Sequence, residues 1–120
     1  MNLESYVKEL GNIFTKLGIL KVDWEKDVEG IEKEVYELFH DNKINENFVN
    51  DNYYLFVGFY HEKVTKNYPE MEKYYLKAFD KGNSLAMTFL GIYHYTVTKN
   101  YSEMEKYLQM AIYLGDNGAM

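Results

Sequence analysis

The stretch Val64–Tyr74, VTKNYPEMEKY, is repeated thirty-three residues later as Val97–Tyr107, VTKNYSEMEKY. Extended in both directions, Phe56–Met87 aligns with Phe89–Met120 at the same offset, and eighteen of the thirty-two positions are identical. A fixed period of this length is typical of stacked-repeat proteins, in which one unit cannot bury its apolar face alone. The sequence therefore predicts two tandem repeats over residues 51–120.

Each repeat has the pattern of two helices joined by a tight turn. In the second copy, two runs of apolar residues recur at offsets of three and four, which is helical spacing. The first run is Ala86, Phe89, Leu90, Tyr93 and Val97, and the second is Met104, Tyr107, Leu108, Ala111 and Ile112. Between the runs, Asn100 can cap the second helix while Glu103 returns the bond. Ser102 with Glu105 offers the same capping box one residue later.

Glycines occupy two further positions in each repeat. Gly82 and Gly115 follow the second helix of their copies, where a left-handed residue is expected to end it. Gly58 and Gly91 lie inside the first helix, where glycine costs about 1 kcal/mol relative to alanine. Because this cost recurs in both copies, we expect another helix to cross each first helix at close range there.

The second copy carries motifs of a known repeat family. Ala86–Tyr93 (AMTFLGIY), Asn100–Tyr107 (NYSEMEKY), Ala111-Ile112 and Gly115 resemble the Sel1-like branch of the tetratricopeptide repeats, in the Tyr- and Met-rich type abundant in giant DNA viruses of protists. The chain departs from the usual Sel1-like pattern by lacking a glycine-rich turn after the first helix. The resemblance implies an α-solenoid of stacked antiparallel helical hairpins that binds other proteins, with no catalytic residues to carry over.

Residues 1–50 are predicted to form an N-terminal helical hairpin followed by a loop. Two apolar seams at helical spacing indicate its helices. They are Leu3, Val7, Leu10, Phe14 and Leu17, then Trp24, Val28, Ile31, Val35 and Leu38. Gly18 is expected to stop the first helix, Asp23 to cap the second and Asn42 to stop it. The hairpin is either a degenerate repeat or a dedicated cap, and the whole chain is predicted to be all-α with about six helices.

Composition and charge weigh against several classes of function. The 120 residues carry a net charge of −6 with a pI near 5.0, so the basic surface that nucleic-acid binding needs is not expected. Cysteine is absent, which excludes a disulfide framework and a thiolate site. Met1–Glu4 does not resemble a signal peptide, and the apolar runs are too short to span a bilayer. We expect a cytoplasmic protein, in the host cytoplasm if viral, that binds neither nucleic acid nor membrane.

The two copies differ on the face of the first helix that lies opposite its apolar stripe. The residues that differ are Leu55, Phe59 and Glu62 in the first copy and Thr88, Ile92 and Tyr95 in the second. In solenoids of the family that this chain resembles, the first helix lines a concave groove. We therefore predict that these six residues form the floor that holds an extended peptide or a partner helix, since exposed Phe, Ile and Tyr suit hot spots. The alternative is that they pack on the N-terminal hairpin or on a neighbouring repeat.

Two other functions are compatible with the sequence. His61 and His94 occupy equivalent positions and could hold a metal for hydrolysis, but a third ligand is not evident. Position 65 is threonine, so the zinc motif of two histidines four residues apart is missing. Hydrogen bonding of the histidines in the turn is the simpler interpretation, and we expect no metal, no cofactor and no enzymatic activity.

The last repeat also suggests self-association. Gly118–Met120 aligns with Leu85–Met87, which is where a further first helix would begin. Repeat arrays usually end in a helix with a polar outer face. We therefore expect the chain to be part of a longer array, or the flank of its last helix to pack against another molecule such as a second copy.

Overall fold

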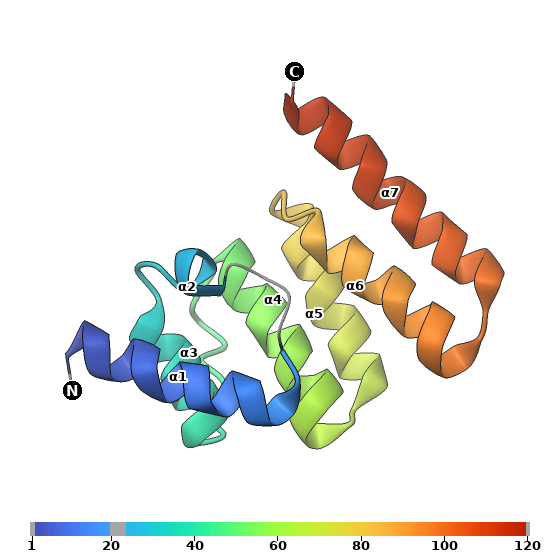
Figure 1. Ribbon diagram of the computed structural model, residues 1–120. Coiled ribbons are helices and arrows are strands. Elements are labelled where there is room, and N and C mark those ends of the chain that lie inside the picture. Colours follow the sequence, from blue (N-terminus) through green and yellow to red (C-terminus); the bar gives the residue numbers. More distant parts are fainter. Residues whose placement is uncertain (1, 20–23, 120) are drawn as a thin grey trace.

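The computed structural model describes residues 2–19 and 24–119, with side chains through Tyr113. Over these residues the protein is all-helical, as predicted, with seven α-helices instead of about six, two π-helical turns and no strand (Figure 1). The elements are α1 (Leu3–Leu17), α2 (Trp24–Asp27), α3 (Glu32–His40), α4 (Asp51–Tyr60), η1 (His61–Thr65), α5 (Tyr68–Asp80), α6 (Leu85–Tyr93), η2 (His94–Thr98) and α7 (Tyr101–Ala119).

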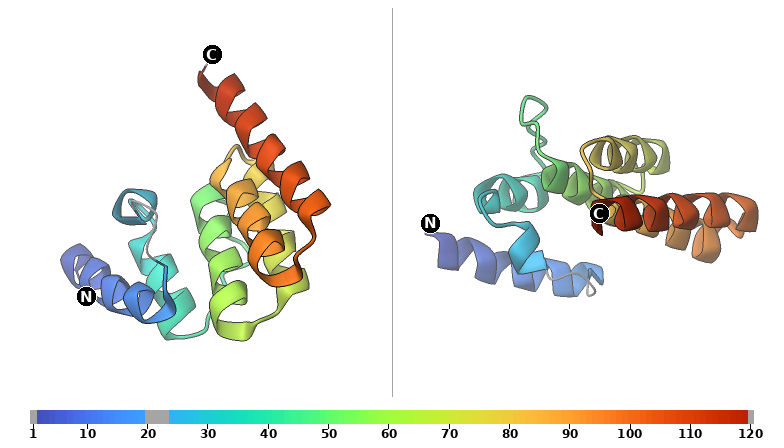
Figure 2. Two further views of the ribbon diagram at one scale, coloured as in Figure 1. Left: turned by 45° about the vertical axis from the view of Figure 1, so that its right-hand side comes forward. Right: turned by 90° about the horizontal axis from the view of Figure 1, so that it is seen from above.

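The helices are arranged as successive neighbours. Helix α4 packs against α5, and α6 packs against α7, so each of the two copies forms a helical pair. Helix α5 also packs on α6, which joins the pairs, while α3 lies between α1 and α4 on the other side (Figure 1; Figure 2). The molecule measures 44 × 33 × 26 Å, and the C-terminal part of α7 extends away from the other helices.

Asparagine caps begin the second helix of both copies, as was predicted at Asn100. The Asn67 side chain accepts a hydrogen bond from the Glu70 backbone N–H at 3.3 Å, and Asn100 accepts one from Glu103 at 3.2 Å. The Asn100 N–H, which was expected to bond the Glu103 side chain, instead donates to Thr98 Oγ1 at 3.1 Å. The cap is therefore present, but its second bond comes from the preceding turn.

That preceding turn is π-helical, which apolar spacing did not predict. In η1 the His61 carbonyl accepts from the Asn67 N–H at 3.0 Å, and Lys66 takes the left-handed conformation with φ 58°. Thr65 Oγ1 lies 2.9 Å from His61 Nδ1, so side chains hold the wide turn together. Val97, which α-helical spacing placed on the inward stripe of the second copy, is exposed as a result.

The close helix crossings predicted at two glycines are confirmed. A Cβ atom at Gly58 would lie 2.3 Å from the Tyr75 ring, and one at Gly91 would lie 2.6 Å from Leu108 Cδ2. Tyr75 and Leu108 are equivalent residues on α5 and α7. Each glycine therefore admits a large side chain from the second helix of its own repeat.

The N-terminal hairpin follows the prediction at both of its stops. Helix α1 begins at an Asn2 cap and ends at Gly18, whose φ is 77°. Asn42, after α3, is left-handed as expected, with φ 55°, and its side chain accepts a hydrogen bond from the Tyr60 hydroxyl at 2.9 Å. The same residue thus ends α3 and ties the hairpin to α4.

The single helix predicted over Trp24–Leu38 is wrong. The structure divides it into α2 and α3, with Gly30 left-handed between them at φ 86°. Val28 and Ile31, on either side of this glycine, are both buried. The chain turns between them at the left-handed Gly30, whereas a continuous helix would keep φ negative there. The expected cap Asp23 lies outside the described residues.

The two glycine stops of the second helices behave differently. Gly82 is left-handed as predicted, with φ 100°, whereas α7 continues through Gly115 to Ala119. After Gly82, Asn83 donates to Asn52 Oδ1 at 2.9 Å and accepts from the Leu85 N–H at 3.0 Å, which fixes the turn. The second copy has Leu85 in the position of Asn52, and a leucine side chain cannot accept such a bond. The stop predicted at Gly115 is therefore wrong.

An aromatic cluster centred on Phe14 joins the N-terminal hairpin to the first repeat. The Phe14 ring stacks on Phe56 of α4 at 5.6 Å and meets Phe39 edge-on at 5.1 Å. Phe39 in turn meets Tyr60 edge-on at 5.7 Å. Phe56 and Tyr60 are thus covered by the hairpin, as their equivalents Phe89 and Tyr93 are by the first repeat.

Candidate interaction surface

The six residues predicted to form a groove floor do not form one exposed surface. Leu55 is 0% exposed and Phe59 is 3% exposed, so neither can contact a partner in this structure. The prediction of an exposed floor is wrong at these two positions, where the packing alternative holds. Of the three residues in the second copy, Thr88 is half-buried, while Ile92 is 44% exposed and Tyr95 is also exposed.

Glu62, the third first-copy residue, has a partner inside the chain. The hydroxyl of the fully buried Tyr75 donates to Glu62 Oε1 at 2.9 Å. Burial, followed by the charge of Glu62, raises the pKa of Tyr75 well above its usual value, so the hydroxyl keeps its proton. The second copy has Tyr95 and Leu108 at these positions, so both members of the pair change together.

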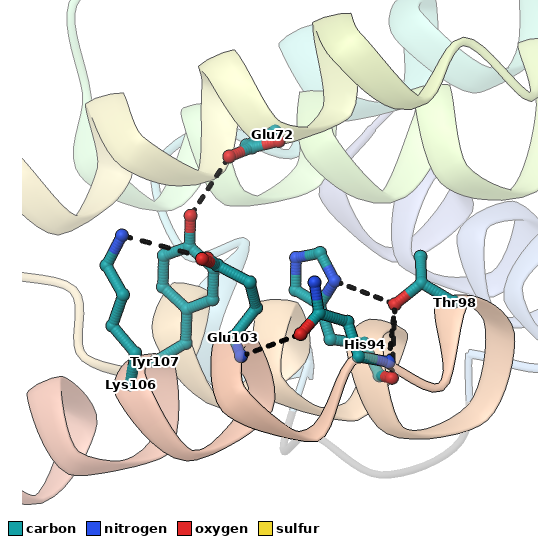
Figure 3. A network of polar contacts seen from close by, with 7 residues as sticks. Glu72, His94, Thr98, Glu103, Lys106 and Tyr107 are labelled. Atoms are coloured by element: carbon teal, nitrogen blue, oxygen red, sulfur yellow. Dashed lines mark hydrogen bonds and ion pairs between the residues drawn. The ribbon is translucent and has the colours of Figure 1, made fainter.

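The second repeat covers one side of the first repeat. Phe59 of α4 meets Phe89 of α6 edge-on at 4.6 Å, and the Tyr68 and Tyr93 rings lie 5.2 Å apart. The Tyr107 hydroxyl of α7 reaches across to Glu72 Oε1 of α5 at 2.9 Å (Figure 3). We name Phe59, Tyr68 and Glu72, together with Phe79 farther along α5, the first stacking face.

The same face recurs, uncovered, on the second repeat. Adding thirty-three residues to each member of the first stacking face gives Ile92, Tyr101, Glu105 and Ile112. Ile92 is 44% exposed, Ile112 is 63% exposed, and the other two are exposed as well. With Tyr95 beside them, we name this set the open face. Comparing the two copies over both of their helices could have found the open face. The predicted groove was drawn from the first helices only, whereas Tyr101, Glu105 and Ile112 lie in the second helix.

The Tyr107–Glu72 bond has an electrostatic consequence. Burial first, and then the hydrogen bond to Glu72, raises the pKa of Tyr107 to about 12. The hydroxyl is therefore a stable donor at neutral pH. In Figure 3 this bond links the two repeats, since Glu72 lies on α5 and Tyr107 on α7.

The two histidines stabilise the π-helical turns. Nδ1 of His61 lies 2.9 Å from Thr65 Oγ1, and Nδ1 of His94 lies 2.9 Å from Thr98 Oγ1. Each ring also stacks on a tyrosine of the following helix, at 5.7 and 5.5 Å. Burial lowers the pKa of His61, so the uncharged form is favoured. Among the described residues, no group of three or more His, Cys, Asp or Glu side chains could hold a metal ion.

A shallow hollow lies where α7 diverges from α5. Its volume is about 460 Å³, and it is lined by Phe79, Lys106, Gln109, Met110 and Tyr113. Apolar spacing did not predict it, because the hollow depends on the direction of α7.

Comparison of the chain with family models, with curated proteins and with solved structures found no match. The resemblance to Sel1-like repeats therefore stays a prediction. Within the described part of the chain, every helix is too short or too polar to cross a membrane.

Proposed function

We propose that this chain is a non-catalytic protein-interaction module, built as an α-solenoid of Sel1-like repeats, which binds a partner through the open face. The observation that supports the proposal is the contrast between two equivalent positions. Phe59 is covered by the second repeat, whereas its counterpart Ile92 is exposed together with Tyr101 and Ile112.

The chemistry of the open face suits a helix better than an extended peptide. Its members lie on α6, on the adjoining turn η2 and on the neighbouring helix α7, much as the first repeat presents α4 and α5 to the second repeat. A partner helix with an apolar stripe can lie on such a surface, and exposed tyrosine and isoleucine supply the buried anchors. The half-buried Thr88 also lies on α6, and Tyr95 in η2 extends the surface beyond the end of α6.

Affinity purification of the full chain from its native cell, read by mass spectrometry, tests the proposal. We expect a protein that is retained by wild type and lost from the double variant Ile92→Ser, Tyr95→Ser. The control is Leu3→Ser, Val49→Ser, which removes two side chains of similar exposure away from the open face. Circular dichroism should confirm that both variants fold. Retention of every partner by the Ile92 and Tyr95 variant would contradict the proposed binding face.

A further inference from the structure

The open face has the composition of a surface that already works as an interface inside this chain. In the first repeat, the equivalent residues pack two aromatic pairs and place one carboxylate opposite a tyrosine hydroxyl. The open face keeps this arrangement of apolar and aromatic side chains around one carboxylate, Glu105. Continuity with the internal interface thus indicates that a helical pair would cover it.

The charge of the face permits contact between identical surfaces. The chain carries a net charge of −6, which opposes self-association in general. On the open face, however, Glu105 is the one ionisable carboxylate, and the Gln109 amide donates to it at 3.3 Å. Glu103 and Lys106 of α7 form an ion pair of their own at 3.7 Å. Two open faces therefore meet with little repulsion.

Among the described residues, the opposite end of the molecule does not offer a matching surface. The aromatic side chains that could receive an open face, Phe56 and Tyr60 in the first repeat, are already covered by Phe14 and Phe39. Apart from Leu3 at its start, the outer side of α1 instead exposes mainly polar and charged side chains. They are Glu4, Lys8, Glu9, Asn12 and Lys16. Head-to-tail stacking of copies into a filament is therefore disfavoured.

We propose that two copies of this chain pack their open faces together about a twofold axis and form a closed dimer. A self-complementary patch that is used by both partners closes in this way and leaves no surface for further growth. In the dimer, each Glu105 accepts a hydrogen bond from a tyrosine hydroxyl of the other copy, as Glu72 does from Tyr107 within the chain. This inference rests on the proposed function, and it identifies the partner as a second copy of the chain.

Sedimentation equilibrium and light scattering of the full chain over a wide concentration range test the dimer. We expect the mass to rise from 14.3 kDa to twice that value and then to stay constant. Ile112→Asp should weaken dimerisation on the order of a hundredfold, because the twofold axis places the substitution in both copies. Ile92→Asp, on the other helix, should act in the same direction.

The matched control is Val49→Asp. Val49 and Ile112 are both β-branched and both 63% exposed, but Val49 lies outside the open face. Val49→Asp should dimerise as wild type does, and circular dichroism should be unchanged in every variant. A mass that stays at one chain, a mass that keeps growing, or a dimer that survives both Ile112→Asp and Ile92→Asp would each overturn the inference. A constant monomer that still retains another protein through Ile92 and Tyr95 would overturn the dimer and leave the proposed function in place.

Discussion

The first and second repeats share most of their sequence, yet they differ in what covers them. The first repeat lies between the N-terminal hairpin and the second repeat, and its Phe59 is buried. Within the described residues the second repeat has a neighbour on one side only, and the equivalent Ile92 is exposed. The comparison teaches that a residue of one repeat can be core in one copy and surface in the other, because burial depends on the next repeat.

Truncation of the equivalent residues Phe59 and Ile92 should give the largest contrast. Phe59→Ala should lower the free energy of unfolding by about 3–5 kcal/mol, because it leaves a cavity between the repeats. Ile92→Ala should cost less than about 1 kcal/mol in the monomer, because the side chain is largely solvated. Denaturant unfolding, performed at a concentration where the protein is monomeric, measures both. Equal losses would contradict the assignment of one face as covered and the other as open.

Alkaline pH should separate the buried Tyr107 from the exposed Tyr101 of the same repeat. The pKa of Tyr107 is raised from 10.0 to about 12, so its contribution to stability is complete below pH 10 and is lost as the pH rises through about 12. In the Tyr107→Phe variant, the free energy of unfolding should therefore fall less steeply between pH 10 and 12, by roughly 2 kcal/mol. Unfolding curves at several pH values measure this difference. Tyr101→Phe, at an exposed position, is the control. A parallel decline of wild type and Tyr107→Phe would contradict the assigned role of Glu72.

Alanine substitution at Gly58 and Gly91 should distinguish how tightly the two helices of each repeat pack together. Gly58→Ala should cost about 1–2 kcal/mol, because the buried Tyr75 ring is held by Glu62 and overpacking outweighs the gain in helix propensity. Gly91→Ala should cost less, because the half-buried Leu108 can change rotamer. Thermal unfolding of the two variants decides the order. The reverse order would show that the Tyr75 ring moves more easily than Leu108.

The helix caps should show where the repeats do not differ. Asn67→Ala and Asn100→Ala should each cost about 1 kcal/mol, since each residue accepts one bond from its own helix. Their aspartate variants should retain most of the stability, because aspartate can accept the same bond. A cost confined to one repeat would mean that the caps depend on the neighbouring repeat after all.

Local features of the fold were predictable from the sequence because they depend on a few adjacent residues. The Asn67 and Asn100 caps and the stops at Gly18, Asn42 and Gly82 all fall in this group. The close crossing at Gly58 was also predictable, since the cost of glycine in a helix demands compensation elsewhere.

The errors occur where a distant side chain decides the outcome. Helix α7 runs through Gly115, although Gly82 ends α5, because the turn after Gly82 is held by Asn52 from another helix. Glu62 was predicted to line a groove, but its carboxylate accepts a hydrogen bond from the Tyr75 hydroxyl. Neither contact leaves a signal in local spacing.

The sequence by itself determined that this protein is helical, that residues 56–87 and 89–120 repeat one unit, and where most of its helices start and stop. These properties follow from backbone preferences and apolar periodicity, which act over a few residues. Only the tertiary structure decided which copy of the repeated face is covered, because burial is a property of neighbours. The first stacking face is closed by Phe89, Tyr93 and Tyr107 of the second repeat, and the open face has no such neighbour within the described chain.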